Sequence, residues 1–297
     1  MLDLRGVRRS FDGTPVLHDV SFGVVPGRIT GFVGANGAGK TTTMRIIMRI
    51  LSADEGTVTW DGAPVTDAVR TNFGYMPEER GLYPKMAVRD QVAYFGELHG
   101  LRRPDALAQT DRLLDAVGLA ERAKGALKDL SLGNQQRAQI AAALVAEPVL
   151  LVLDEPFSGL DPLAVDAVID VLRRRARDGV PVLFSSHQLD LVERLCDDVV
   201  ILSKGAVVAA GTVEQLRAAG GANRYRLAVD NDAGWVRSQP GLTVLDVEGD
   251  TAIVDIPATN GTDHRRELLV EAMRRGEVRE FARVRTPLSE IFREAIR

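Results

Sequence analysis

The sequence predicts an α/β protein built around a parallel sheet, with a small α+β domain at its carboxyl end. The uninterrupted apolar run at 149–153, and the similar stretch at 182–185, are typical of strands that are covered on both faces. A segment with helical apolar spacing, 162–177, lies between them. Strands that alternate with helices in this way indicate parallel pairing. At 297 residues the chain is long enough for about two domains.

The amino-terminal residues predict short strands and then a phosphate-binding unit. The β-like runs at 2–7 and 21–25 are bounded by turn residues, Thr14-Pro15 and Pro26-Gly27. Residues 28–33 predict a buried strand that leads into the glycine-rich sequence GANGAGK, and helical apolar spacing follows over 41–51. Strand, glycine loop and helix in this order are typical of a phosphate-binding βα unit.

The middle of the chain predicts a helical insert at about 80–133, because apolar residues such as Val88, Val92 and Phe95 recur at helical intervals. The α/β pattern then resumes up to a short helix at 213–219, which Gly220-Gly221 ends. The remaining predicted elements are the strands 225–229, 243–247 and 252–256 and the helices 265–274 and 288–296. We therefore predict one domain over 1–220 and a second, α+β, over 222–297.

Composition limits the classes of function. Apolar residues make up 45% and charged residues 26%, as in globular proteins generally. The net charge of −4 gives no support to nucleic-acid binding, so no nucleic-acid partner is expected. Cys196 is the only cysteine, which excludes an internal disulfide. No apolar run approaches the roughly 18 residues of a membrane span, and no secretory signal is apparent. These features predict a cytoplasmic protein.

Residues 34–41 match G-x-x-x-x-G-K-[ST] completely. Glycines let successive N–H groups of such a loop turn inward around a phosphate. Lys40 is expected to reach the β- and γ-phosphates, and the Thr41 hydroxyl to ligate Mg²⁺. An ordinary tight turn is the alternative, but a strand before the loop and a helix after it favour a nucleotide. The predicted ligand-binding residues here are Gly34, Asn36, Gly37, Ala38, Gly39, Lys40, Thr41 and Thr42.

Asp154 and Glu155 directly follow the apolar run at 149–153. Ligands of parallel sheets gather at the carboxyl ends of the strands, so this pair is expected beside the phosphate loop. Asp154 can hold Mg²⁺, and Glu155 can deprotonate an attacking water. A helix-capping acid on a loop is the alternative.

These motifs, with three more between and after them, resemble the ATP-binding subunits of ABC transporters. LSLGNQQR at 130–137 resembles that family's signature sequence, SGLD at 158–161 its following loop, and His187 its switch histidine. The resemblance covers residues 1 to about 220. It implies a P-loop NTPase cassette, in which a mixed sheet carries an antiparallel β subdomain and the helical insert, and it implies the cofactors ATP and Mg²⁺.

The resemblance also implies roles for single residues. Glu155 would be the general base, and His187 would contact the γ-phosphate. Phe11 would stack on adenine, although a core aromatic on an edge strand is the alternative. Ser131 and Gly133 would open a helix toward the nucleotide of a second protomer, and Asp161 would lie at the dimer interface.

Two positions depart from the family pattern. Glu78 stands where a glutamine is usual, and could ligate Mg²⁺, pair with Arg80 toward a partner, or be a solvated loop charge. The signature carries Leu132 for a glycine and Asn134 for a glutamine, but it retains Ser131 and Gly133, so activity is expected to survive.

Three stretches narrow the resemblance to ATPases of the ABC-2 exporter branch, which includes sodium-efflux and antibiotic-resistance exporters. They are PEERGLYP at 77–84, LSLGNQQ at 130–136 and SSHQLD at 185–190. The branch implies a bacterial homodimer or heterodimer on the inner face of the cell membrane, bound to separate transmembrane permease subunits. Soluble ATPases of the superfamily that work on nucleic acid or translation, and a nucleotide-binding regulator without activity, are the alternatives.

Overall fold

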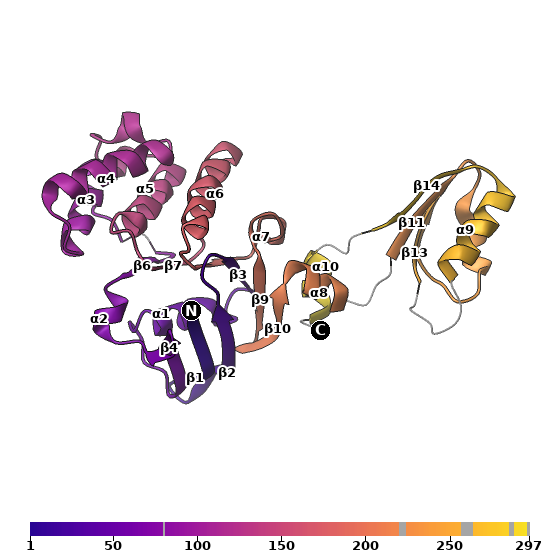
Figure 1. Cartoon of the computed structure of the whole chain (residues 1–297), viewed down its shortest axis with the longest axis horizontal. Helices are drawn as coiled ribbons and strands as arrows, with labels where there is room; N and C mark the ends of the chain where they lie inside the picture. Colours follow the sequence, from indigo (N-terminus) through magenta and orange to yellow (C-terminus); the bar gives the residue numbers. More distant parts are fainter. Residues whose placement is uncertain (80, 220–223, 257–263, 285–287, 296–297) are drawn as a thin grey trace. The chain divides into compact units, whose positions relative to one another are not determined.

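The computed structural model describes residues 1–79, 81–219, 224–256, 264–284 and 288–295 (Figure 1). The chain forms two compact units, Met1–Val213 and Glu214–Ala295. No helix of the described ranges is long and apolar enough to cross a membrane.

A six-stranded sheet forms the centre of the first unit, in the order β10-β9-β3-β8-β7-β6. Strands β9, β3, β8, β7 and β6 run parallel to one another, and the edge strand β10 pairs antiparallel with β9. Every residue of the three middle strands is buried, as the continuous apolar runs predicted. The bounds are β3 Ile29–Val33, β6 Phe73–Met76, β7 Leu150–Leu153, β8 Val182–Ser186, β9 Asp198–Ser203 and β10 Ala206–Thr212.

A second, antiparallel sheet belongs to the same unit and has the order β2-β1-β4-β5. Its alternating apolar residues, among them Leu2, Leu4 and Val20, share one core with Phe32 of β3 and Met44 of α1. The two sheets therefore enclose helix α1 and the loop that precedes it. The bounds are β1 Leu2–Phe11, β2 Thr14–Val24, α1 Lys40–Ile47, β4 Glu55–Trp60, β5 Ala63–Pro64 and α2 Asp67–Arg70.

The predicted helical insert forms a group of helices on the side of β6 and β7 that faces away from the antiparallel sheet (Figure 1). Pro104 lies in the first turn of α4, where a missing N–H costs nothing. Helix α5 begins after Ser131, whose hydroxyl accepts the Asn134 N–H and so caps the helix. The bounds are α3 Val88–Leu98, α4 Arg103–Ala116 and α5 Leu132–Leu144, with 3-10 turns η1 Ala120–Arg122 and η2 Leu127–Asp129.

Helices α6 Pro162–Arg177 and α7 Leu189–Leu195 complete the first unit, and α8 Val213–Ala219 begins at its boundary with the second. Asp161 caps α6 by accepting the Ala164 N–H at 2.9 Å. The bounds of α6 coincide with the sequence prediction.

The second unit is an antiparallel sheet in the order β12-β13-β11-β14, together with helices α8, α9 and α10. Apolar residues of β11 and β13 form its core with Leu268 and Ala272 of α9. The guanidinium of Arg224 is nearly buried and forms ion pairs with Asp255 at 3.0 Å and Glu290 at 2.5 Å. The bounds are β11 Arg224–Val229, η3 Ala233–Ser238, β12 Thr243–Glu248, β13 Thr251–Asp255, α9 His264–Arg275, β14 Val278–Arg283 and α10 Leu288–Ala295.

Candidate nucleotide site

Strand register brings four loops to one edge of the central sheet. Val33 at the end of β3 is paired with Ser186 of β8, Phe184 of β8 with Leu153 of β7, and Leu153 in turn with Met76 of β6. The phosphate loop, His187, the Asp154-Glu155 pair and the Glu78 loop therefore all leave the sheet at its carboxyl edge. Parallel sheets bind their ligands at this edge.

The phosphate loop is shaped by glycines. Gly37 and Gly39 have φ of 79° and 106°, a region that residues with a β-carbon rarely adopt. A β-carbon on Gly39 would lie 2.5 Å from Leu17 of β2, and one on Gly34 would lie 2.5 Å from the Leu202 carbonyl. Only glycines at these positions let the loop fit between β2 and β9.

Lys40 is buried inside this loop. Its side chain is 7% exposed, and its ammonium donates to the carbonyls of Gly34 at 2.7 Å and Ala35 at 3.3 Å. Thr41 and Thr42 are half-buried in the first turn of α1. The positive end of that helix and a buried ammonium are thus directed at one loop, which suits an anionic phosphate.

Asp154 is 1% exposed, and only one of its carboxylate oxygens has a partner in the protein. Oδ1 accepts a hydrogen bond from the Ser185 hydroxyl at 2.5 Å, while Oδ2 is buried and has no hydrogen-bond partner among the described residues. A buried carboxylate is costly unless it is compensated. An unsatisfied hard oxygen at this edge fits Mg²⁺, which prefers oxygen ligands.

Glu155 and His187 form a pair beside it. Glu155 Oε2 lies 3.0 Å from His187 Nδ1, and the glutamate is 9% exposed while the histidine side chain is 57% exposed. Glu155 has φ of 50°, which is uncommon for a residue other than glycine. Such strained conformations cluster at functional sites.

Ser131 and Gly133 open helix α5, and Ser131 is exposed there. A β-carbon on Gly133 would lie 2.8 Å from the Gly159 carbonyl, so the helix start packs closely on the loop after β7. Leu132, one of the departures in the signature, is 57% exposed and leaves that packing intact. Asp161 is the cap of α6, as described above, so its carboxylate has a structural partner within the chain.

Phe11 ends β1, where it pairs with Thr14 across the hairpin turn. Its ring is 41% exposed, and the Arg9 guanidinium lies 4.9 Å from the ring centroid. Phe11 is therefore not the core aromatic that the alternative interpretation expected. The Phe11 ring is accessible at the end of the β1–β2 hairpin. The other strand of this hairpin, β2, lies beside Gly39 of the phosphate loop through Leu17.

Glu78 is exposed in the loop after β6. The amide of Gln139 on α5 anchors this loop by donating to the carbonyls of Pro77 and Glu79, each at 3.2 Å. Arg80, its alternative partner, lies outside the described residues. Across the described ranges, no three His, Cys, Asp or Glu side chains cluster closely enough to bind a metal by themselves. A metal here would need the hydroxyl of Thr41 or the phosphates as further ligands.

Two buried residues of the site have no role in the sequence prediction. The hydroxyl of Ser185 accepts the Glu155 N–H at 2.8 Å, and the amide of Gln136 donates to the Glu155 carbonyl at 2.9 Å. Both lie within motifs named above, but the residue that they contact, Glu155, is 30 positions from Ser185 and 19 positions from Gln136. Sequence patterns indicate no such contact, because it depends on how α5 and β8 pack on β7.

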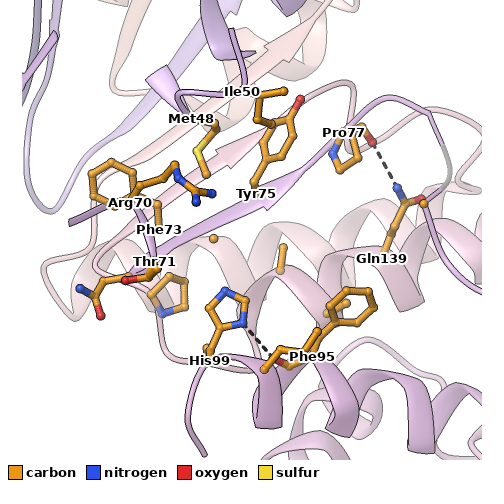
Figure 2. Close-up of a pocket in the computed structure, with 18 of the residues that line it drawn as sticks. Met48, Ile50, Arg70, Thr71, Phe73, Tyr75, Pro77, Phe95, His99 and Gln139 are labelled. Atoms are coloured by element: carbon orange, nitrogen blue, oxygen red, sulfur yellow. Dashed lines mark hydrogen bonds between the residues drawn. The ribbon is translucent and has the colours of Figure 1, made fainter. Parts of the chain in front are cut away.

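An apolar groove of about 370 Å³ lies beside β6 in the same unit (Figure 2). Met48 and Ile50 line one side, and Phe95 of α3 and His99, which follows α3, line the other, with Tyr75 of β6 between them (Figure 2). Two of its apolar lining residues are largely exposed to solvent, Ile50 at 58% and Leu98 at 60%. The groove adjoins the Glu78 loop, because Pro77 also lines it.

Comparison with known proteins places these features in one family. The ABC transporter family model matches residues 17–158, and the C-terminal domain of DrrA1-3-like ATP-binding proteins matches residues 211–296. The ABC transporter ATP-binding protein YhaQ of Bacillus subtilis is 34% identical over 296 residues, which is all of this chain and 98% of YhaQ. The daunorubicin resistance ATP-binding protein DrrA3 of Streptomyces coeruleorubidus is 30% identical over 97% of this chain and 93% of its own.

Solved structures agree with the fold. One ATP-binding subunit of an ABC transporter has a TM-score of 0.70 and 32% identity, over 74% of this chain and 93% of its own. The predicted cassette fold is confirmed, and so is the resemblance based on the five motifs. ATP hydrolysis is characteristic of these proteins. The chain belongs to the ATP-binding proteins of ABC transporters, with a C-terminal domain of the DrrA1-3 type.

Proposed function

We propose that this chain drives solute export, as one half of an ATP-hydrolysing dimer bound to separate permease subunits on the inner face of a bacterial membrane. The observation that carries the proposal is the sheet edge. There the Glu155–His187 pair and an unsatisfied oxygen of Asp154 meet the loop that holds Lys40. The resemblance to a daunorubicin resistance protein favours export.

In this proposal the Thr41 hydroxyl and the Asp154 carboxylate hold Mg²⁺, and Lys40 and the loop N–H groups bind the phosphates. Asp154 Oδ2 is the atom with a free lone pair, and Ser185 keeps the carboxylate oriented. Glu78 lies at the same edge, and we retain it as a second oxygen ligand. Bound Mg²⁺ would neutralise charge on the phosphates.

Glu155 then serves as the general base. Its carboxylate is nearly buried, is 3.0 Å from His187 Nδ1, and can take the proton of a water that attacks the γ-phosphate. Because Nδ1 of His187 faces Glu155, Nε2 is available to contact the phosphate. Phe11 supplies the exposed ring for adenine.

The dimer is proposed because the first two residues at the start of the signature helix, Ser131 and Leu132, are exposed. Ser131 and Gly133 begin a 13-residue helix whose N–H groups carry partial positive charge. In a homodimer or heterodimer this end binds the γ-phosphate of the partner's ATP, near Asp161. ATP then joins the two subunits, and hydrolysis releases them.

We further propose that the groove beside β6 receives an apolar segment of the permease. It combines exposed apolar side chains with a direct connection to the Glu78 loop, so a segment seated there contacts the nucleotide site through that loop. A nucleotide-driven movement of the loop would be transmitted to the membrane subunit.

Leu98→Glu tests this docking. Burying an unpaired carboxylate costs more than about 1.4 kcal/mol, so recovery of the chain with bacterial membranes is expected to fall tenfold or more. ATP hydrolysis by the purified variant should be unchanged. Met273→Glu is the matched control, because Met273 is 65% exposed but lies on α9 of the second unit.

Equal recovery of both variants would contradict docking in the groove. Recovery of the wild-type chain only with ribosomes or DNA would overturn the transport function itself and favour a soluble role.

A further inference from the structure

The backbone of Glu155 is held on both sides by buried side chains. Its N–H donates to Ser185 Oγ at 2.8 Å, and its carbonyl accepts from Gln136 Nε2 at 2.9 Å. Ser185 is 0% exposed and Gln136 is 5% exposed. A residue other than glycine at φ of 50° persists only where its surroundings determine its conformation.

The two contacts come from different elements. Ser185 belongs to β8, and its hydroxyl also donates to Asp154 Oδ1, so one side chain orients the carboxylate of Asp154 and the backbone of Glu155. Gln136 belongs to α5, whose first turn meets the same loop at Gly133 and Gly159. The loop after β7 is therefore fixed between the central sheet and the helical insert.

We propose that Gln136 and Ser185 are positioning residues, which hold the Glu155 backbone in its left-handed conformation and so direct its carboxylate at the attacking water. The inference rests on the proposed role of Glu155 as general base. Loss of either hydrogen bond lets the backbone relax toward ordinary φ, which turns the side chain away from His187. Loss of the Gln136 contact should affect turnover, because Gln136 belongs to α5 and not to the phosphate loop. Loss of Ser185 should affect Mg²⁺ binding as well, because Ser185 also orients Asp154.

Gln136→Met tests the proposal, because methionine keeps the length of the side chain and removes its N–H donor. Turnover at saturating ATP is expected to fall about 10- to 100-fold, as a misplacement of about 1 Å can produce. The Kd for ATP should stay within about twofold. Gln91→Met is the matched control, since Gln91 is also buried, in α3, and its side chain bonds the Tyr83 backbone and not the loop after β7 within the described residues. It should lower stability but not turnover.

Gln136→Glu adds a readout that a packing role would not move. The ionised carboxylate cannot donate, but the protonated acid can donate its O–H to the Glu155 carbonyl, and burial favours the protonated form. The ratio of turnover in Gln136→Glu to turnover in wild type should therefore rise as pH is lowered from 8 to 6. The same ratio for Gln136→Met should be flat.

A double variant separates this inference from the role of Glu155. If Gln136 acts through Glu155, adding Gln136→Met to Glu155→Gln causes no further loss of turnover. Wild-type turnover in Gln136→Met, or an additive loss in the double variant, would overturn the positioning role. Unchanged turnover in Glu155→Gln alone would instead overturn the general base.

Discussion

At the scale of single residues, the site contains two buried charges that the protein compensates only in part. Among the described residues Asp154 has one unsatisfied oxygen, and the Lys40 ammonium donates to the neutral carbonyls of Gly34 and Ala35. Buried charges of this kind are costly. In the proposed complex, Mg²⁺ and phosphate would supply the missing opposite charges, so nucleotide binding and stability should be coupled here.

Lys40→Ala should weaken ATP binding directly, because Lys40 is proposed to contact the phosphates. The loss of a hydrogen bond to a charged group costs about 1.5–3 kcal/mol, or about 10- to 100-fold in Kd. Calorimetry or a fluorescent ATP analogue measures it. Lys124→Ala removes an exposed lysine of the helical insert and should leave Kd unchanged. Wild-type affinity in Lys40→Ala would contradict the assignment of the phosphate loop.

The sequence indicates Lys40, Asp154 and Glu155 because each lies within a short motif whose chemistry depends on neighbouring residues. Ser185 and Gln136 differ, because a serine or a glutamine is compatible with many environments. They belong to the site because they bind the backbone of Glu155. No local sequence pattern predicts the positive φ of that residue. Residues that act through tertiary packing thus become apparent only in the structure.

At the scale of elements, the sequence predicts the helices and strands that have strong local patterns. Helix α6 is amphipathic, begins with Asp161 and Pro162, and ends in arginines, and its predicted bounds are exact. Strands β4, β5, β6, β10 and β14 have no counterpart in the sequence prediction. β10 is mostly alanine and valine with a glycine, and β14 mixes charged and apolar residues without strict alternation. Both lie at sheet edges, where burial imposes little pattern.

The ion pairs of Arg224 join β11, β13 and α10, and they make a prediction about acid stability. The hydrogen bond from Arg224 lowers the pKa of Glu290. Its contribution to folding is therefore present above the unfolded carboxyl pKa of about 4.3 and is lost as pH falls through the folded pKa.

Glu290→Gln should destabilise the second unit by about 1–2 kcal/mol at pH 7, which is about 4–15 °C in Tm, and the difference from wild type should vanish below about pH 3. Fluorescence of Trp235 in a Trp60→Phe background follows this unit alone. Glu280→Gln breaks a more exposed, 3.6 Å pair on the same sheet and should change Tm little. An equal effect of both variants would contradict a special role for Arg224.

At the scale of the whole molecule, the chain joins a cassette of the ABC family to a DrrA-type C-terminal domain. One sheet edge gathers the phosphate loop, Asp154, Glu155 and His187, and α5 presents Ser131 outward from the same unit. The proposed completion of the site by a second subunit would account for the exposure of the helix start at Ser131. ATP binding should then control association, and hydrolysis should reverse it.

Glu155→Gln tests this account most directly. Turnover should fall about 100-fold or more, because a general base contributes at least that much, and the variant with ATP should elute as a dimer by size exclusion with light scattering. Glu147→Gln is the matched control, since Glu147 also has φ of 50° and precedes β7 but lies outside the site. It should hydrolyse ATP normally. Wild-type turnover in Glu155→Gln, or a monomer in saturating ATP, would contradict the account.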